Sequence, residues 1–518
     1  MKKWLTLLLA LALLLPHCAA LADEPAYGPY DKHVSFTASQ YSQITEGGDY
    51  THDEVYYKLQ DMFNFDWELY AVDGSAWHEK NTMWITGGTM PDILFFGWNA
   101  VEYQQYAEQE LIKPLPDGWE SKYPNLAAQV EATGIAEAIK VNGKTYGIPH
   151  TIIHLVGPKN FVYAMHTLYY YRLDWAKELG YDWGVSCTLD EFTSYLRDCK
   201  EKFGSVGMVQ STGTLLKPLL YQFSKGYNAI YKNEEGKYVL GFADKGTVEG
   251  IQFLRDMYNE GLISKEYYLS NYNEWYAGKA AVIEYWGGPL HPQDMANNWL
   301  AAASEPNAKT LDDVKNIIGT VTVTDNNGVY HAAGTQGNFC FGSLFSPDLD
   351  DETFDRILAM YDYFATLEGF ELTQLGIRGV DWDKDEEGHY TLLCPEILDG
   401  TYAVIREKYP SMYYLYLRNV LSDSAAYINP LIDPYWRQMS DDMYEFRCSQ
   451  DIVPFDADLA FYSSDAANHY SINWNTAVDR LVLDSSLDIE TEVARLIEEN
   501  RFMWEPLINE LNEKFGAK

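Results

Sequence analysis

The chain is poor in cysteine for its length of 518 residues. Five of its six cysteines follow residue 22, and an odd number at irregular spacing, without a CxxC pair, is neither a disulfide framework nor a zinc motif. Cys187 and Cys199 flank a predicted helix, whose rise of about 1.5 Å per residue keeps their sulfurs too far apart to bridge. We therefore expect free, buried thiols.

Positive charge is also scarce. Lysine and arginine total 38 against 76 aspartates and glutamates, and the formal net charge is −38. The field of so acidic a chain repels phosphate backbones and anionic lipid. We therefore expect no nucleic-acid partner, and solubility outside the cell is the simplest role for the charge.

Long apolar runs are absent beyond the N-terminus. Residues 1–22 have the layout of a signal peptide, with Lys2 and Lys3, an apolar run from Leu5 to Leu15, and the small residues Ala20 and Ala22 at the expected cleavage point. The run is shorter than the roughly 20 residues that span a bilayer. We expect cleavage near Ala22 and a secreted chain or one on the outer face of the cell membrane. A lipid anchor at Cys18 is the less favoured alternative, because Pro16-His17 precede it.

Catalytic and metal-binding motifs are also missing. There is no GxSxG elbow and no P-loop, and Thr82 stands where a zincin that began at His78-Glu79 would need its second histidine. Asp381, Asp383 and Asp385 alternate, but an EF-hand in this register would need glycine at 386 and glutamate at 392. We expect a solvated hairpin there, no metal and no cofactor.

Strands alternate with amphipathic helices in the first third of the chain. Strands are predicted at 33–38, 65–72 and 90–96, and helices at 51–62, from a cap at Ser75 onward, and at 101–110. This order predicts an α/β fold with a largely parallel sheet, which binds ligands beyond the carboxyl ends of its strands.

The middle of the chain is richer in helix. A capping box at Thr188–Glu191 predicts a helix that continues to Phe203. Two further amphipathic helices are predicted at 247–260, ending at Gly261, and at 351–368, ending at Gly369.

Several segments resemble, in the same order, the bacterial extracellular solute-binding proteins that capture carbohydrates for ABC importers. They are GTMPDILFFGWNA (88–100), GKTYGIPH (143–150), LYYYRLDWAKELGYD (168–182), TLDEFTSYLRDCKEKF (188–203), WYAGKAAVIEYWGG (275–288) and GIRGVDWD (376–383). The last is similar to a feature of the lipoprotein-type branch of this family.

The resemblance implies a type II periplasmic-binding-protein-like fold, in which two α/β lobes close about a hinge. The implied division is a signal peptide at 1–22, the first lobe at 23–150, the second lobe at 151–330, a return to the first lobe at 331–375, and a mostly helical segment at 376–518 that completes the second lobe and the cleft. The implied function is capture of a carbohydrate or oligosaccharide by a monomer that passes it to membrane permease subunits, without catalysis.

A carbohydrate site needs flat rings for stacking and planar polar groups for paired hydrogen bonds. The chain is rich in rings, with 15 tryptophans and 41 tyrosines, so aromatic content alone does not locate the site. Position after predicted strands, together with the resemblance, selects Gln40, Tyr41, Trp77, Trp98, Asn99, Trp275, Tyr285, Trp286, Gln336, Asp381 and Trp382 as ligand contacts. For each of them the competing interpretation is packing.

Two other functions stay open at this point. A secreted glycoside hydrolase would use two facing carboxylates about 5 to 10 Å apart, and no pair stands out among the 76 acidic residues. An adhesin or a sensor would keep the same fold and cleft without an importer.

Overall fold

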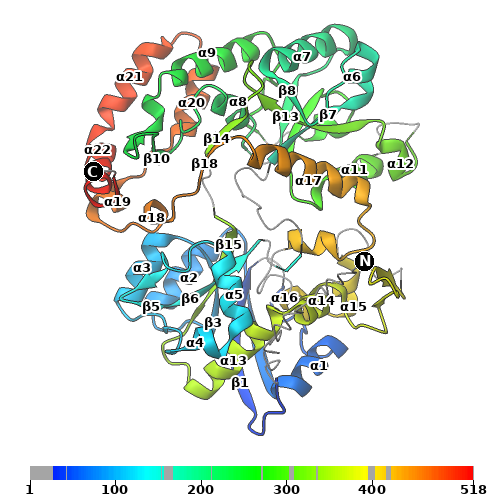
Figure 1. The fold of residues 1–518 in the computed structure, drawn as a ribbon, viewed down its shortest axis with the longest axis vertical. Coiled ribbons are helices and arrows are strands. Elements are labelled where there is room, and N and C mark those ends of the chain that lie inside the picture. The colour runs from blue at the N-terminus through cyan, green and yellow to red at the C-terminus, as the bar shows by residue number, and fades with distance from the viewer. Residues whose placement is uncertain are drawn as a thin grey trace, which may run out of the picture.

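The computed structural model describes residues 27–41, 44–152, 155–156, 167–211, 213–269, 272–302, 308–333, 337–394, 403–415 and 422–516. They fold into two lobes, one above the other in Figure 1. Each lobe has its own five-stranded sheet and its own buried core. The predicted α/β class and two-lobed architecture are confirmed.

The sheet of the first lobe is largely parallel, as predicted, with β15 as its one antiparallel strand. Its order is β2-β1-β3-β15-β6, formed by Phe65–Val72, Val34–Tyr41, Ile93–Gly97, Phe339–Phe345 and Gly147–Thr151. β1 runs parallel to β2 and β3, whereas β15 runs antiparallel to both β3 and β6. β15 differs because it enters this lobe from the second one, and its direction is set by that crossing.

Helices cover both faces of this sheet. They are α1 Glu54–Phe63, α2 Trp77–Thr86, α3 Ala100–Glu108, α4 Trp119–Lys122, α5 Pro124–Ala132, α13 Asp351–Phe364 and α14 Leu367–Leu375; a β4–β5 hairpin (Lys140–Val141, Lys144–Thr145) precedes β6. The predicted cap at Ser75 is wrong: Ala76 occupies the N-cap of α2, and Ser75 hydrogen-bonds to Asp73.

The helix predicted at 351–368 is two helices. α13 ends at Phe364, and Thr366 then caps α14 by accepting a hydrogen bond from the Gly369 amide at 3.1 Å. Gly369 therefore lies in the first turn of α14, where its missing side chain lets the backbone of Tyr363 approach. A Cβ at Gly369 would stand 2.1 Å from the Tyr363 carbonyl oxygen.

The second lobe has the sheet order β8-β13-β7-β12-β9, formed by Ser186–Thr188, Ile318–Thr324, Thr167–Arg172, Val282–Trp286 and Met208–Gln210. Around it lie α6 Leu173–Leu179, α7 Leu189–Phe203, α8 Lys217–Tyr221, α9 Gly246–Asn259, α10 Asn273–Tyr276, α11 His291–Ala302, α12 Leu311–Val314 and the hairpin β10–β11 (Ile230–Lys232, Tyr238–Leu240). The capping box at Thr188 and the stop of α9 before Gly261, which has φ +72, are confirmed.

The segment 376–518, which was expected to complete the second lobe and the cleft, is divided between the lobes. β16 Trp382–Lys384, β17 Tyr390–Leu392, α15 Ala403–Lys408 and α16 Met412–Leu415 belong with the first lobe, whose core buries Trp382, Ile405 and Tyr409. After η3 Ser422–Tyr427, the helices α17 Pro434–Cys448, α19 Asp465–His469, α20 Trp474–Leu483, α21 Ile489–Glu499 and α22 Arg501–Phe515 lie on the second lobe. The sequence pattern shows helices here but not which core they cover.

Two short strands pair where the chain passes between the lobes. β14 His331–Ala333 runs parallel to β18 Asp451–Val453, with His331 opposite Asp451. The Asp451 carboxylate lies 2.8 Å from the His331 ring and 3.0 Å from the Lys225 ammonium, and Asp325 approaches the other ring nitrogen at 3.4 Å. These contacts connect β14 and β18 to Lys225 and Asp325 of the second lobe.

The charge cluster at Asp451 predicts a pH-dependent contribution to stability. Burial raises the pKa of Asp451, but Lys225 and His331 outweigh it and hold the pKa below its usual value. The folded pKa is therefore the lower one, so the contribution is present above about pH 4 and is lost as pH falls through the folded value. Asp451→Asn should destabilise the protein at pH 7 by no more than about 1 kcal/mol, since the pair is partly solvated, and by less at pH 3. Urea unfolding at both pH values checks this; an equal loss at both would contradict it.

None of the helices in the described ranges is long and apolar enough to cross a membrane. The predicted leader at 1–22 and Cys18 lie outside the described residues. The described cysteines are free, and Cys187 and Cys199 are buried as expected, but Cys448 is exposed.

Candidate functional site

In each lobe, the carboxyl ends of some strands point toward the other lobe, on the side where the chain passes between the lobes. In the first lobe, β6 ends and β15 begins at this edge, where Phe339 pairs with Thr151, and Phe341 pairs with Gly97 at the end of β3. In the second lobe, β7 begins here, and Thr167 pairs with Trp286 at the end of β12. Because the chain enters and leaves each lobe at these edges, the two edges face one another, as Figure 1 shows. Ligands of open α/β sheets bind at such edges.

Aromatic rings gather at the edge of the first lobe. Tyr41, at the end of β1, stacks on Phe95 with ring centroids 5.8 Å apart and planes 2° apart, and it meets Trp77 edge-on at 6.0 Å. Gly97 makes room for the indole, since a Cβ there would lie 2.2 Å from Trp77 Cη2. Both predicted contacts keep part of their ring surface exposed. The structure thus brings Tyr41 and Trp77 together.

The polar groups of Trp98 and Asn99 serve the fold. Trp98 Nε1 donates to the Phe341 carbonyl oxygen at 2.7 Å, and the Asn99 Oδ1 caps α3 by accepting from the amides of Val101 and Glu102 at 3.1 and 3.2 Å. Any contact of Trp98 with a ligand would therefore use the small exposed part of its ring rather than its N–H group.

The close approach of Trp98 to β15 yields a testable prediction. A Cβ at Gly342 would stand 2.6 Å from Trp98 Nε1 and 2.8 Å from the Ile148 carbonyl oxygen. We expect Gly342→Ala to displace the indole and to lower the free energy of unfolding by about 1–3 kcal/mol. Gly184→Ala is the matched control, because a Cβ at Gly184 meets no atom within 4 Å. Urea unfolding compares the two, and equal stabilities would contradict the account.

Trp286 is the most exposed predicted ring, with 37% of its surface accessible. Its carbonyl oxygen accepts from the Tyr170 hydroxyl at 2.8 Å, which fixes the end of β12, while the indole lies at the sheet edge with its centroid 6.4 Å from that of the His291 ring. Tyr285 is half-buried and donates to Asp294 at 3.2 Å; burial and that carboxylate raise its pKa, so the phenol stays protonated.

A polar pocket of about 150 Å³ opens behind the loop that follows β9. Thr214, on this loop, lies 3.5 Å from Thr167 at the sheet edge and donates to Glu284 at 2.8 Å. Lys217 also lines the pocket, and burial lowers its pKa. Tyr268, 53% exposed, stands at the same pocket. Sequence reasoning missed these residues because they come from separate segments and carry no motif.

Four of the predicted contacts are buried. The Gln40 amide donates to the Tyr413 carbonyl oxygen at 3.2 Å, and Trp275 Nε1 contacts the Met295 sulfur at 3.2 Å. Asp381 accepts from Lys408 at 2.6 Å, and Trp382 Nε1 donates to the Gly376 carbonyl oxygen at 3.1 Å. Their burial favours packing over the predicted ligand contact. Gln336 lies outside the described residues.

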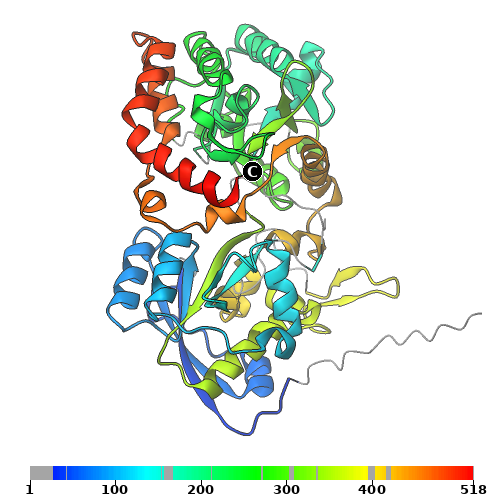
Figure 2. The same ribbon diagram turned by 60° about the vertical axis from the view of Figure 1, so that its left-hand side comes forward.

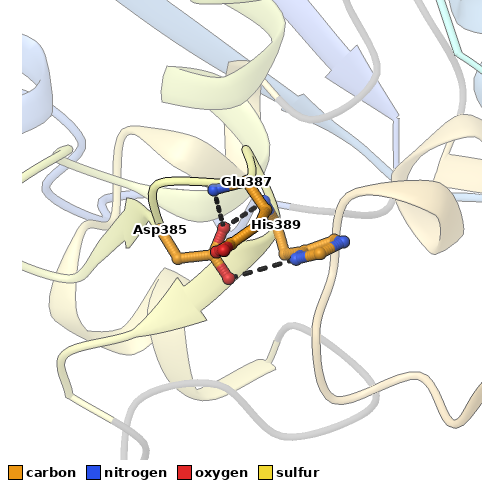
Figure 3. Close-up of side chains that lie close together, drawn as sticks. All are labelled: Asp385, Glu387 and His389. Carbon is orange, nitrogen blue, oxygen red and sulfur yellow. Dashed lines mark hydrogen bonds and ion pairs between the residues drawn. The ribbon is translucent and has the colours of Figure 1, made fainter.

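The alternating aspartates do not converge on one point. Asp381 is buried and Asp383 pairs with Arg378 at 2.9 Å. Figure 3 shows that Asp385, Glu387 and His389 do lie together, at the turn of the β16–β17 hairpin. The Asp385 carboxylate accepts from the amides of Glu387 and His389 at 3.0 and 2.7 Å and lies 3.1 Å from the His389 ring. These turn hydrogen bonds account for the cluster, which is exposed to solvent.

Comparison with known proteins identifies two relatives by sequence. No protein-family model matches the chain. It is 22% identical to lipoprotein LipO of Bacillus subtilis over 365 residues, which cover 66% of this chain and 64% of LipO. It is 24% identical to the fructooligosaccharide ABC transporter substrate-binding protein FusA of Streptococcus pneumoniae over 229 residues, 41% of either protein.

Solved structures match nearly the whole chain. A structure of FusA in complex with fructo-nystose superposes with a TM-score of 0.67 at 16% identity, covering 93% of this chain and 99% of that one. The alginate-binding protein AlgQ2 superposes with a TM-score of 0.66 at 15% identity, covering 94% and 98%. The chain therefore has the two-lobed fold of the extracellular solute-binding proteins of ABC transporters, and the resemblance seen in its sequence is confirmed.

Proposed function

We propose that this protein captures a carbohydrate, in particular an oligosaccharide, between its lobes and passes it unchanged to the permease subunits of an ABC importer. The observation that carries the proposal is that rings lie at the facing sheet edges of both lobes: the exposed indole of Trp286 in the second lobe and the Tyr41–Trp77 ring pair in the first. Rings on both edges can stack on the two apolar faces of a sugar when the lobes close.

The polar pocket behind Thr214 adds the second requirement of a sugar site. Gln210, Lys217 and Tyr268 line it and can exchange hydrogen bonds with hydroxyl groups. A transport protein must also release its cargo, so we expect micromolar affinity, about −8 kcal/mol. FusA and AlgQ2, whose names state binding of fructooligosaccharide and alginate, agree with this ligand class.

The carboxylates at the edge of the second lobe favour binding over hydrolysis. Glu284 is buried and accepts from Thr214, and Asp294 accepts from Tyr285. Each is engaged in holding a neighbouring side chain, whereas a glycoside hydrolase needs two carboxylates that face the scissile bond. We therefore propose a glycoside hydrolase only as the less favoured alternative to a binding protein.

We further propose that the mature protein acts as a monomer outside the cell. Lys2 and Lys3 with the apolar run that follows support export and cleavage near Ala22, and Cys18 gives the lipid-anchored alternative. Mass spectrometry of the protein from its producing cell distinguishes a chain that begins near Asp23 from one that begins at a lipidated Cys18.

A thermal-shift screen of the mature protein against sugars, oligosaccharides and peptides tests the function. A ligand at 100 times its dissociation constant stabilises by about 2.7 kcal/mol. We expect at least one oligosaccharide to raise the melting temperature and to be recovered intact by chromatography. Stabilisation by peptides alone would contradict the ligand class, and cleavage of the sugar would contradict the function.

A further inference from the structure

A second, larger pocket lies beside the crossing strands. It has a volume of about 730 Å³, within the range of small-molecule sites, and its walls include Val101 of α3, Tyr231 of β10, Phe455 after β18, and Tyr462 and Tyr470 from the region of α18 (Ala457–Ala460) and α19. Figures 1 and 2 show α18, in orange, between the two lobes, with α3 in the first lobe and β10 and α19 in the second on either side of it. None of the predicted carbohydrate contacts within the described ranges lines it.

The fold keeps this pocket open. α18 is a single short turn, and the Phe461 ring at its end packs 6.2 Å from Trp98 on the first lobe. Ala457, Ala460 and Ala467 supply small side chains where larger ones would fill the space. The pocket is thus formed by the segment from β18 through α18, where the chain passes back to the second lobe.

The walls offer carbon surface rather than hydrogen-bonding groups. The Tyr231 hydroxyl donates to Asp244 at 3.1 Å, the Tyr462 hydroxyl donates to Glu510 at 3.3 Å, and the Tyr470 oxygen accepts from Trp474 Nε1 at 3.1 Å. With their oxygens engaged, these tyrosines and Phe455 present rings to the pocket. Such a surface suits a flat apolar group.

The charge of the lining is negative. Lys232 is paired with Asp456 at 3.4 Å, and Asp456 also accepts from the Tyr238 hydroxyl at 2.8 Å and from the Leu459 amide at 3.0 Å. Asp458 is exposed and makes no hydrogen bond or ion pair with the described residues. An ammonium group near Asp458 would gain a counter-ion, and the ring faces attract cations as well.

We propose that this pocket binds a small organic cation, an aromatic ring that carries an amine, with the ring against Tyr231, Phe455 and Tyr470 and the ammonium directed to Asp458. Because no predicted carbohydrate contact of the described residues lines this pocket, the proposal does not depend on which ligand the cleft binds.

Three compounds with one ring and different charge test the proposal by titration calorimetry on the mature protein. Tryptamine is the cation, indole is neutral and indole-3-acetate is the anion. We expect tryptamine to bind about fivefold more tightly than indole, and indole-3-acetate more weakly than indole. Equal affinities for the three, or no binding of tryptamine, would overturn the proposal.

Two variants locate the site. Asp458→Asn, on an exposed side chain, should remove the advantage of tryptamine over indole, whereas Glu490→Gln on α21 removes one exposed negative charge elsewhere and should leave it. Ala457→Trp should fill the pocket and abolish binding of all three compounds, with circular dichroism as the check on folding. An unchanged tryptamine affinity in Asp458→Asn would place the cation elsewhere and contradict the proposal. Thermal shift with oligosaccharide on the same samples reports the cleft separately.

Discussion

Replacing Trp286 by alanine is expected to weaken oligosaccharide binding at least about tenfold, while the protein stays folded. The indole is exposed at the end of β12, so its loss leaves no cavity in a core. A ring that stacks on a sugar contributes about 0.5–1.5 kcal/mol beyond the apolar area it buries, and about 1.4 kcal/mol corresponds to a factor of ten. Titration calorimetry with the oligosaccharide found in the screen measures the effect.

Phe502→Ala is the matched control, because Phe502 is a large exposed ring, 70% accessible, on α22. It should leave the affinity unchanged. If Trp286→Ala binds as tightly as the unaltered protein, the indole is not part of the site.

Asp381→Ala should have the largest effect on stability, a loss of about 3–5 kcal/mol in the unfolding of the first lobe. The carboxylate is fully buried, and it accepts from Lys408 at 2.6 Å, from the Tyr409 hydroxyl at 2.8 Å and from the Ile377 amide at 2.7 Å. Its removal leaves these donors without their acceptor. Urea unfolding followed by fluorescence measures the loss.

The outcome also separates packing from ligand contact at this position. Asp383→Ala is the control: Asp383 is partly exposed and pairs with Arg378 in solvent, so it should cost less than about 1 kcal/mol. A ligand role for Asp381 would instead lower affinity with little change in stability, and that result would contradict the account.

Local signals in the sequence predicted much of the fold. The strand at 65–72 was predicted at its observed bounds, and the capping box at Thr188 identified the start of α7. Parallel neighbours β1 and β3 bring Tyr41 and Gly97-Trp98 to one edge, so reasoning from strand ends located the first-lobe edge correctly. These features succeed because they depend on a few neighbouring residues.

The burial of single side chains was harder to predict. Trp286 and Trp382 both follow apolar or turn-rich segments and sit near polar residues, yet one is exposed at an edge and the other is in the core. Trp382 shares the buried core of the first lobe with Ile405 of α15 and Met412 of α16, which come from more than twenty residues further along the chain. The pocket behind Thr214 likewise joins β9, the loop at Tyr268 and α20, and no local pattern links them.

Small-angle X-ray scattering of the mature protein, with and without the stabilising oligosaccharide, tests the central claim most directly. If the lobes close on the sugar, the radius of gyration falls and saturates at the dissociation constant found by calorimetry, and chromatography recovers the sugar unchanged. An unchanged radius of gyration under saturating sugar, or a cleaved sugar, would contradict capture by lobe closure.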